Sequence, residues 1–101
     1  MSMIIVCLLG LVGCWRDASV GDYFDVVAAD VCAKVEACEL QRMEPCHDLF
    51  VEAVCAVYDC GARFDDMEMR AEMCASAIEA QECEEVGRGF VPDVCFQAPG
   101  R

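Results

Sequence analysis

The chain has 101 residues, and ten of them are cysteines. Their number and spacing make them the first candidates for a chemical role. A short chain this rich in thiols builds either a disulfide scaffold or a metal–thiolate centre. The other candidates are one histidine and 19 acidic residues, which could bind a metal or act in acid–base catalysis. The distances along the chain between these residues decide among the possibilities.

The cysteine spacing favours disulfides. From Cys32 to Cys95 the successive steps are 6, 8, 9, 5, 14, 9 and 12 residues, so neither C-x-x-C nor C-x3-C occurs. Those two spacings are typical of zinc sites and of helical thiolate sites. A nine-residue step in a helix turns by about 900°, which places the two sulfurs on opposite faces. We therefore expect no metal site and no other cofactor.

The polar residues do not form a catalytic pattern. His47 lies between Cys46 and Asp48, but sequence neighbours on a helix point apart and do not form a nucleophile–base pair. The local acidic clusters, Asp65-Asp66 with Glu68 and Glu82 with Glu84-Glu85, lack the D-x-D-x-D-G pattern of a calcium loop. We interpret them as helix caps and solvated charge, and expect no enzymatic activity.

The first 14 residues, MSMIIVCLLGLVGC, carry no charged side chain. Their apolar run is about ten residues long, roughly half of what a membrane-spanning helix needs, and it fits the apolar region of an export signal. The last four residues, Leu11-Val12-Gly13-Cys14, resemble the bacterial lipobox. The resemblance implies a signal peptide over residues 1–13, cleavage before Cys14, and a diacylglycerol and palmitate anchor on Cys14. Residues 14–21 would then be a lipidated tether.

Lipidation predicts where the protein resides. Two or more acyl chains hold a protein stably in a membrane, whereas one is marginal. Trp15, and not aspartate, follows Cys14, so the inner-membrane retention signal of enterobacterial lipoproteins is missing. We expect an exported protein that its lipid anchors in the bacterial cell envelope, at the outer membrane in preference to the inner one.

Export would also divide the ten cysteines into three groups. Cys7 leaves with the signal peptide and Cys14 carries the lipid. An even number of cysteines in an oxidising compartment predicts four disulfides. The eight that remain are Cys32, Cys38, Cys46, Cys55, Cys60, Cys74, Cys83 and Cys95.

The formal net charge of −12 restricts the partners. Nucleic-acid binding requires clustered Lys and Arg against the phosphate backbone, so we expect no nucleic-acid partner. All 19 acidic residues follow Cys14, so the charge belongs to the exported domain. We expect a membrane contact through the lipid and an unknown protein or cationic partner.

The hydrophobic pattern becomes helical from Asp22, which begins a domain over residues 22–101. Apolar residues recur at steps of three and four along the first helix, which Asp22 caps. A turn follows over residues 41–44, and a second helix runs from Pro45 at its first position to Cys60, with Gly61 as its stop. The residues expected to face inward are Phe24, Val27, Val31, Val35 and Cys38 in the first helix and Phe50, Val54, Val57 and Tyr58 in the second.

A third helix starts at a capping box formed by Asp65 and Glu68 and fades near Gln81. Its inward residues are Met67, Ala71, Cys74 and Ile78. The tail from Cys83 onward contains Gly and Pro and reads as a loop, with Phe90, Val91, Val94 and Phe96 available to cover the bundle. The predicted fold is all-α, a three-helix and possibly four-helix bundle that disulfides hold together, with a loop-like C-terminal tail.

Eight thiols allow 105 pairings, so connectivity does not follow from the sequence alone. An antiparallel arrangement of the first two helices about residue 42 suggests Cys38–Cys46 and Cys32–Cys55. Cys83–Cys95 would hold the tail, which leaves Cys60–Cys74. Such a domain has a thin core, because Leu40, Leu49 and Ile78 are its only Leu or Ile residues after Cys14. Disulfides worth about 2–4 kcal/mol each would therefore decide whether it folds.

Longer segments carry a second resemblance. The segments VCAKVEAC at 31–38, Pro45-Cys46, CASAIEAQEC at 74–83 and PDVC at 92–95 are similar to those of small, acidic, cysteine-rich lipoproteins predicted in myxobacteria and related bacteria. The resemblance implies location and fold and no particular activity. The expected function is a lipid-anchored envelope protein with a structural or protein-interaction role. The alternative is a small lipid- or metal-binding module of the periplasm or cell surface.

Overall fold

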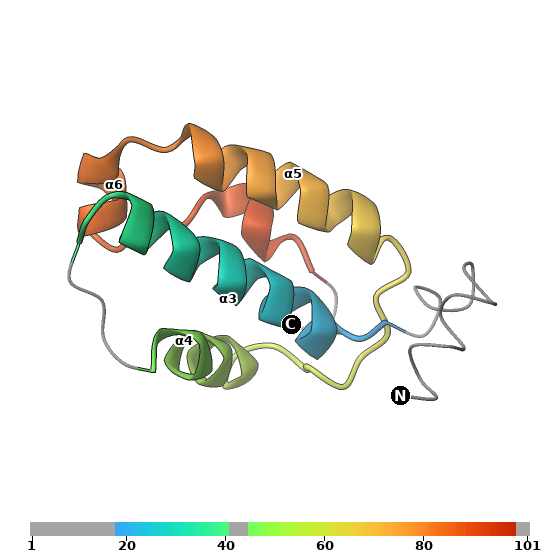
Figure 1. Cartoon of the computed structure of the whole chain (residues 1–101). Coiled ribbons are helices and arrows are strands. Elements are labelled where there is room, and N and C mark those ends of the chain that lie inside the picture. The colour runs from blue at the N-terminus through green and yellow to red at the C-terminus, as the bar shows by residue number, and fades with distance from the viewer. Residues whose placement is uncertain (1–17, 41–44, 99–101) are drawn as a thin grey trace, which may run out of the picture.

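The structure, a computed structural model, describes residues 18–40 and 45–98 and is helical throughout them apart from turns and one isolated β-bridge between Ser19 and Arg63. The all-α disulfide-linked fold predicted from the sequence is confirmed. In Figure 1, α3 lies between α4 on one side and α5 on the other. The elements are α3 (Val20–Ala37), α4 (Cys46–Cys55), α5 (Met67–Ala80), α6 (Cys83–Gly87) and the 3-10 turn η1 (Asp93–Phe96).

Helix α3 is the centre of the fold and begins two residues before the predicted start. Ser19 is its N-cap, and Asp22 is the acidic residue of the capping box and not the cap itself. The Asp22 amide donates to the Ser19 hydroxyl over 3.1 Å, and the Ser19 amide donates to the Asp22 carboxylate over 2.9 Å. The predicted tether over residues 14–21 is too long, because Ala18 is buried and its carbonyl accepts from the Phe64 amide.

Helix α4 ends at Cys55, five residues earlier than predicted. The cause is the Cys55–Cys60 disulfide, whose Cα atoms lie 5.5 Å apart. Two residues five positions apart in a helix are turned by about 140° and separated by about 7.5 Å along the axis, so a bridge requires the chain to leave the helix. Val57 consequently faces solvent with 59% of its surface exposed, and the prediction that it faces inward is wrong.

The starts of α4 and α5 also differ in detail from the expectation. Pro45 is the N-cap of α4 and not its first helical residue. Asp66 is the N-cap of α5, and its side chain makes no capping hydrogen bond. The predicted capping box between Asp65 and Glu68 does not form. Instead the Asp65 carboxylate lies 2.6 Å from the guanidinium Nε of Arg63.

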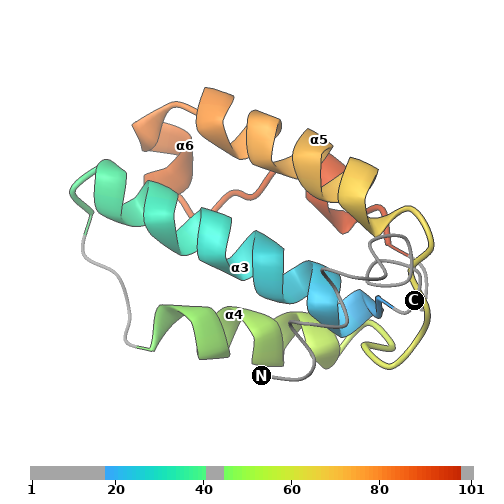
Figure 2. The same cartoon turned by 45° about the vertical axis from the view of Figure 1, so that its right-hand side comes forward.

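The tail is more ordered than a loop. Glu82 and Glu85 form a capping box that starts α6, and Val86 in that helix is buried. Val91, Val94 and Phe96 pack against the core as expected. Phe90, predicted to cover the bundle, is instead 58% exposed. Figure 2 shows the tail returning behind α5, where η1 lies.

An aromatic cluster fills the space between the helices and the tail. Tyr23 and Phe24, adjacent on α3, lie with ring centroids 5.0 Å apart. The Phe64 ring lies 4.8 Å from Tyr23, and the Tyr58 ring lies 5.1 Å from Phe24. Phe96 from η1 completes the group at 6.3 Å from Phe24. Aromatic rings bury large areas each, so they offset the shortage of Leu and Ile.

Two tyrosines from this cluster hold the tail. The Tyr23 hydroxyl donates to the Cys95 carbonyl over 2.7 Å, and the Tyr58 hydroxyl donates to the Phe96 carbonyl over 2.9 Å. Burial raises the pKa of Tyr23 to about 12; the charge of Arg70 opposes this shift and the neighbouring Tyr58 adds to it. Because the tyrosinate form is disfavoured only in the folded state, folding keeps Tyr23 neutral beyond its ordinary value of 10.0.

The raised pKa predicts a loss of stability in alkali. The contribution of Tyr23 is fully present below pH 10 and is lost between pH 10 and about 12, since the unfolded state ionises first. The slope is at most about 1.4 kcal/mol per pH unit. Guanidinium unfolding followed by circular dichroism should show a shallower alkaline fall for Tyr23→Phe than for the wild type. Equal slopes for the two proteins would contradict the assignment.

Candidate functional site

The eight predicted disulfide cysteines all pair with one another. Two bridges leave α3: Cys32–Cys46 joins it to the start of α4, with Cα atoms 6.1 Å apart, and Cys38–Cys83 joins its C-terminal end to the start of α6, with Cα atoms 5.6 Å apart. Helix α3 is therefore tied covalently to the elements that precede and follow α5.

The other two bridges do not involve α3. Cys55–Cys60 closes the turn after α4. Cys74–Cys95 ties α5 to η1, with Cα atoms 4.7 Å apart and both side chains fully buried. Every cysteine of the described residues is thus oxidised. The sulfur of a disulfide is not a thiolate, so these cysteines offer no thiolate ligand or nucleophile.

The predicted pairings, Cys38–Cys46, Cys32–Cys55, Cys60–Cys74 and Cys83–Cys95, are all wrong. The symmetric helical hairpin behind the first two has the wrong register. Cys46 meets Cys32 and not Cys38, a difference of six residues or about 9 Å of helix rise. The unexpected helix α6 then brings Cys83 to Cys38. The five-residue step from Cys55 to Cys60, followed by Gly61, was a usable signal of a local bridge.

The predicted lipidation site, Cys14, and the signal peptide over residues 1–13 lie outside the described residues. The first described residue is Ala18, immediately before the N-cap of α3.

His47, the only histidine of the chain, bridges two helices at the surface. Its ring Nε2 lies 3.2 Å from the carbonyl of Asp25 and 3.5 Å from the Asp25 carboxylate on α3. Its Nδ1 lies 3.5 Å from the carboxylate of Asp48. The cysteine beside it, Cys46, is in a disulfide. Within the described residues, the polar contacts of His47 are therefore with a carbonyl and two carboxylates.

The acidic clusters are partly used by the fold. Glu82 and Glu85 cap α6, and Glu84 pairs with Arg88 over 2.7 Å. Within residues 18–40 and 45–98, no group of three or more His, Cys, Asp or Glu side chains is arranged to hold a metal ion.

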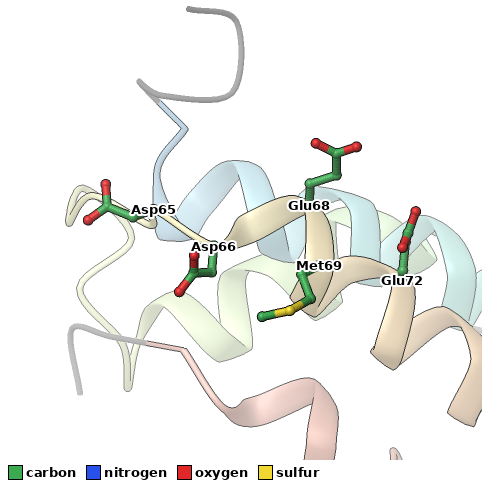
Figure 3. Close-up of a pocket in the computed structure, with 5 residues that line it drawn as sticks. All are labelled: Asp65, Asp66, Glu68, Met69 and Glu72. Carbon is green, nitrogen blue, oxygen red and sulfur yellow. The ribbon is translucent and has the colours of Figure 1, made fainter. Parts of the chain in front are cut away.

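The remaining carboxylates at the start of α5 surround a surface hollow of about 310 Å³. Figure 3 shows the Met69 side chain with Asp66 and Glu72 on either side of it, while Glu68 points away from Met69. Asp65 completes the lining, which therefore combines four carboxylates with one thioether.

Two other hollows differ in character. One lies between α3 and α5, where the Lys34 ammonium donates to the Glu79 carbonyl over 2.8 Å. Burial raises the pKa of Asp30, which lines the same groove. The other, of about 510 Å³, lies between the C-terminal half of α5 and the segment that includes Phe90, and its lining includes Ala77, Ala80 and Pro92.

Comparison with protein-family models, curated proteins and solved structures finds no match for this chain. None of the helices within the described residues has the length and apolar character to cross a bilayer. The class that the described residues define is a small disulfide-rich helical protein, and four disulfides indicate folding in an oxidising environment.

The disulfides should be reduced in a definite order. Cys83 is exposed and Cys38 half-buried, whereas Cys74 and Cys95 are fully buried. A reductant needs access to sulfur, so limited treatment with a phosphine should open Cys38–Cys83 well before Cys74–Cys95. Alkylation and peptide mapping of the partly reduced protein would identify both the order and the pairs. In guanidinium the order should disappear, and early opening of Cys74–Cys95 in the native protein would contradict the packing.

Proposed function

We propose that this chain is an exported protein, lipid-anchored at Cys14 in the bacterial envelope, that binds other proteins and has no catalytic role. The observation that carries the proposal is that all eight cysteines after Cys14 are consumed in disulfides. Cys14 is then the one thiol beyond the signal segment without a place in this framework, and it stands at the lipobox position.

The position of the fold relative to Cys14 supports an anchor. Three residues separate Cys14 from Ala18, the first described residue and already part of the fold. The four steps from Cys14 to Ala18 span at most about 14 Å when the chain is extended. A domain anchored there would stay next to the membrane, with the N-terminal end of α3 nearest the lipid. The residue after Cys14 favours the outer membrane, as the sequence indicates.

An interaction role agrees with the surface. The described residues carry no free cysteine and no grouped metal ligands. They carry instead exposed carboxylates and several exposed apolar side chains. A rigid scaffold that presents charge and apolar groups in fixed positions has the properties of a binding module. The net charge of −12 makes a cationic partner the natural one.

Substitution of Cys14 tests the anchor. We expect the wild-type protein in the bacterial membrane fraction, with an intact mass that includes a diacylglycerol and lacks residues 1–13. Cys14→Ser should move the protein to the soluble periplasmic fraction without the lipid mass. Cys7→Ser, within the predicted signal peptide, is the matched control and should stay lipidated. A membrane-bound Cys14→Ser protein without its signal peptide would overturn the assignment.

The same mass measurement tests the scaffold. Each of the four disulfides has two hydrogens fewer than the pair of thiols that forms it, so reduction should add eight hydrogens to the mature protein. A smaller gain would show that some of the eight cysteines are free and would remove the argument that leaves Cys14 for the lipid.

A further inference from the structure

Helix α5 is apolar on its outer surface as well as on its inner one. Met67, Cys74 and Ile78 face the core. At about 100° per residue, a second set of apolar residues falls within an arc of about 80° on a different face. This set, Met69, Met73, Ala77 and Ala80, is called here the α5 outer strip. Met69 is 51% exposed and Met73 44% exposed.

The strip continues beyond the helix. Ala77 and Ala80 line the hollow of about 510 Å³ that Phe90 also lines. The Phe90 carbonyl accepts a hydrogen bond of 3.0 Å from the Gln81 side chain, which holds this segment against the end of α5. The eleven helical steps from Met69 to Ala80 span about 16 Å, so the apolar surface is elongated and about three helical turns long. Exposed apolar side chains grouped in this way favour an interaction site.

Carboxylates surround the strip at both ends. Asp65, Asp66, Glu68 and Glu72 line the hollow around Met69, and Glu85 and Asp93 line the hollow around Phe90.

The nearby basic side chains already have partners. Arg63 pairs with Asp65, Arg88 pairs with Glu84, and the Arg70 guanidinium donates to the Gln97 side chain. Gln97 is uncharged, so Arg70 keeps its charge, but no ion pair within the described residues joins a basic side chain to Glu68 or Glu72. The charge of the rim is available to a partner.

We propose that the α5 outer strip, together with Phe90, binds a basic amphipathic helix of a partner protein. An apolar stripe three turns long fits a helix laid along it, with apolar side chains at positions i, i+4 and i+7 and Lys or Arg against the acidic rim. Exposed Met side chains suit such a site because the thioether is flexible and polarizable and adapts to different shapes. The proposal rests on the proposed function and names its surface and partner chemistry.

The rim argues against the other occupants. A second copy would bring the same carboxylates together, and like charges in an interface are repulsive. An anionic lipid surface would meet the same repulsion. A basic helix would be attracted by the carboxylates and would bury the apolar strip. Charge complementarity therefore favours it over a second copy and over an anionic lipid surface.

Binding of a model helix tests the proposal. The probe is a synthetic, fluorescently labelled 14-residue peptide of Leu and Lys with one apolar face, and its control is a peptide of the same composition in a scrambled order without that face. Both are titrated by anisotropy against the full mature chain carrying Cys14→Ser, at low and at physiological salt. We expect the amphipathic peptide to bind more tightly than the scrambled one, and salt to weaken its binding.

Matched variants locate the surface. Met69→Ser with Met73→Ser should weaken binding about tenfold, because the apolar contact is lost. Val57→Ser, at a somewhat more exposed apolar residue after α4, should leave binding unchanged. Glu72→Gln should weaken binding by about threefold at low salt, whereas Glu52→Gln on α4 should leave it unchanged. Circular dichroism and the eight-hydrogen mass gain verify that each variant folds.

The outcomes separate the surface from the wider role. Binding that is insensitive to the strip variants but falls with Glu52→Gln or Val57→Ser would overturn this surface and leave a cationic partner in place. Equal binding of the amphipathic and scrambled peptides would overturn the helical apolar contact. No binding of either peptide would overturn the cationic partner as well, independently of the anchor at Cys14. Dimerisation in sedimentation that depends on the strip would overturn the basic helix in favour of a second copy of the chain. Binding to phosphatidylglycerol vesicles that depends on the strip would overturn it in favour of a lipid surface.

Discussion

The covalent attachment of α3 to its neighbours is the constraint on which the rest of the structure depends. Cys32–Cys46 closes a loop of 14 residues and Cys38–Cys83 one of 45, which a chain-entropy model values at about 3 and about 4 kcal/mol. Such amounts are comparable to the whole stability of a small domain. The longer bridge matters most, because it fixes α6 and the tail to the end of α3. The core that these bridges hold together contains few large aliphatic side chains and depends on an aromatic cluster.

The tail shows how the covalent and non-covalent interactions cooperate. It contributes Val91, Val94 and Phe96 to the core, and η1 is a single turn with little stability of its own. The buried Cys74–Cys95 bridge ties this turn to α5, and the two tyrosine hydroxyls donate to the neighbouring carbonyls of Cys95 and Phe96. Each hydrogen bond is worth about 1 kcal/mol net, and the bridge keeps the groups close enough for both to form.

The disulfides also allow the fold to carry a strongly charged surface with exposed apolar side chains. A net charge of −12 repels itself in a compact chain, and apolar side chains such as Met69 and Phe90 on the surface contribute little to folding. A domain that relied on its core alone would tolerate fewer of these features. Here the disulfides offset the cost, so the outer face of α5 presents thioether groups, and the neighbouring segment presents Phe90, inside an acidic rim.

Residue type and local spacing determined much of this protein from the sequence alone. They indicated the helical class, the three main helices with their inward residues such as Phe24 and Ile78, and the oxidation of eight cysteines, because helical periodicity and thiol number are properties of neighbouring residues. The disulfide partners, the early end of α4 at Cys55, the helix α6 and the exposure of Val57 and Phe90 were decided only by the tertiary structure. The pairings of Cys32 and Cys38 depend on the register in which α4 and α6 pack against α3, and the end of α4 depends on the local Cys55–Cys60 bridge. Helical periodicity specifies which face of a helix is buried without specifying how far one helix slides along another or which nearby cysteines pair.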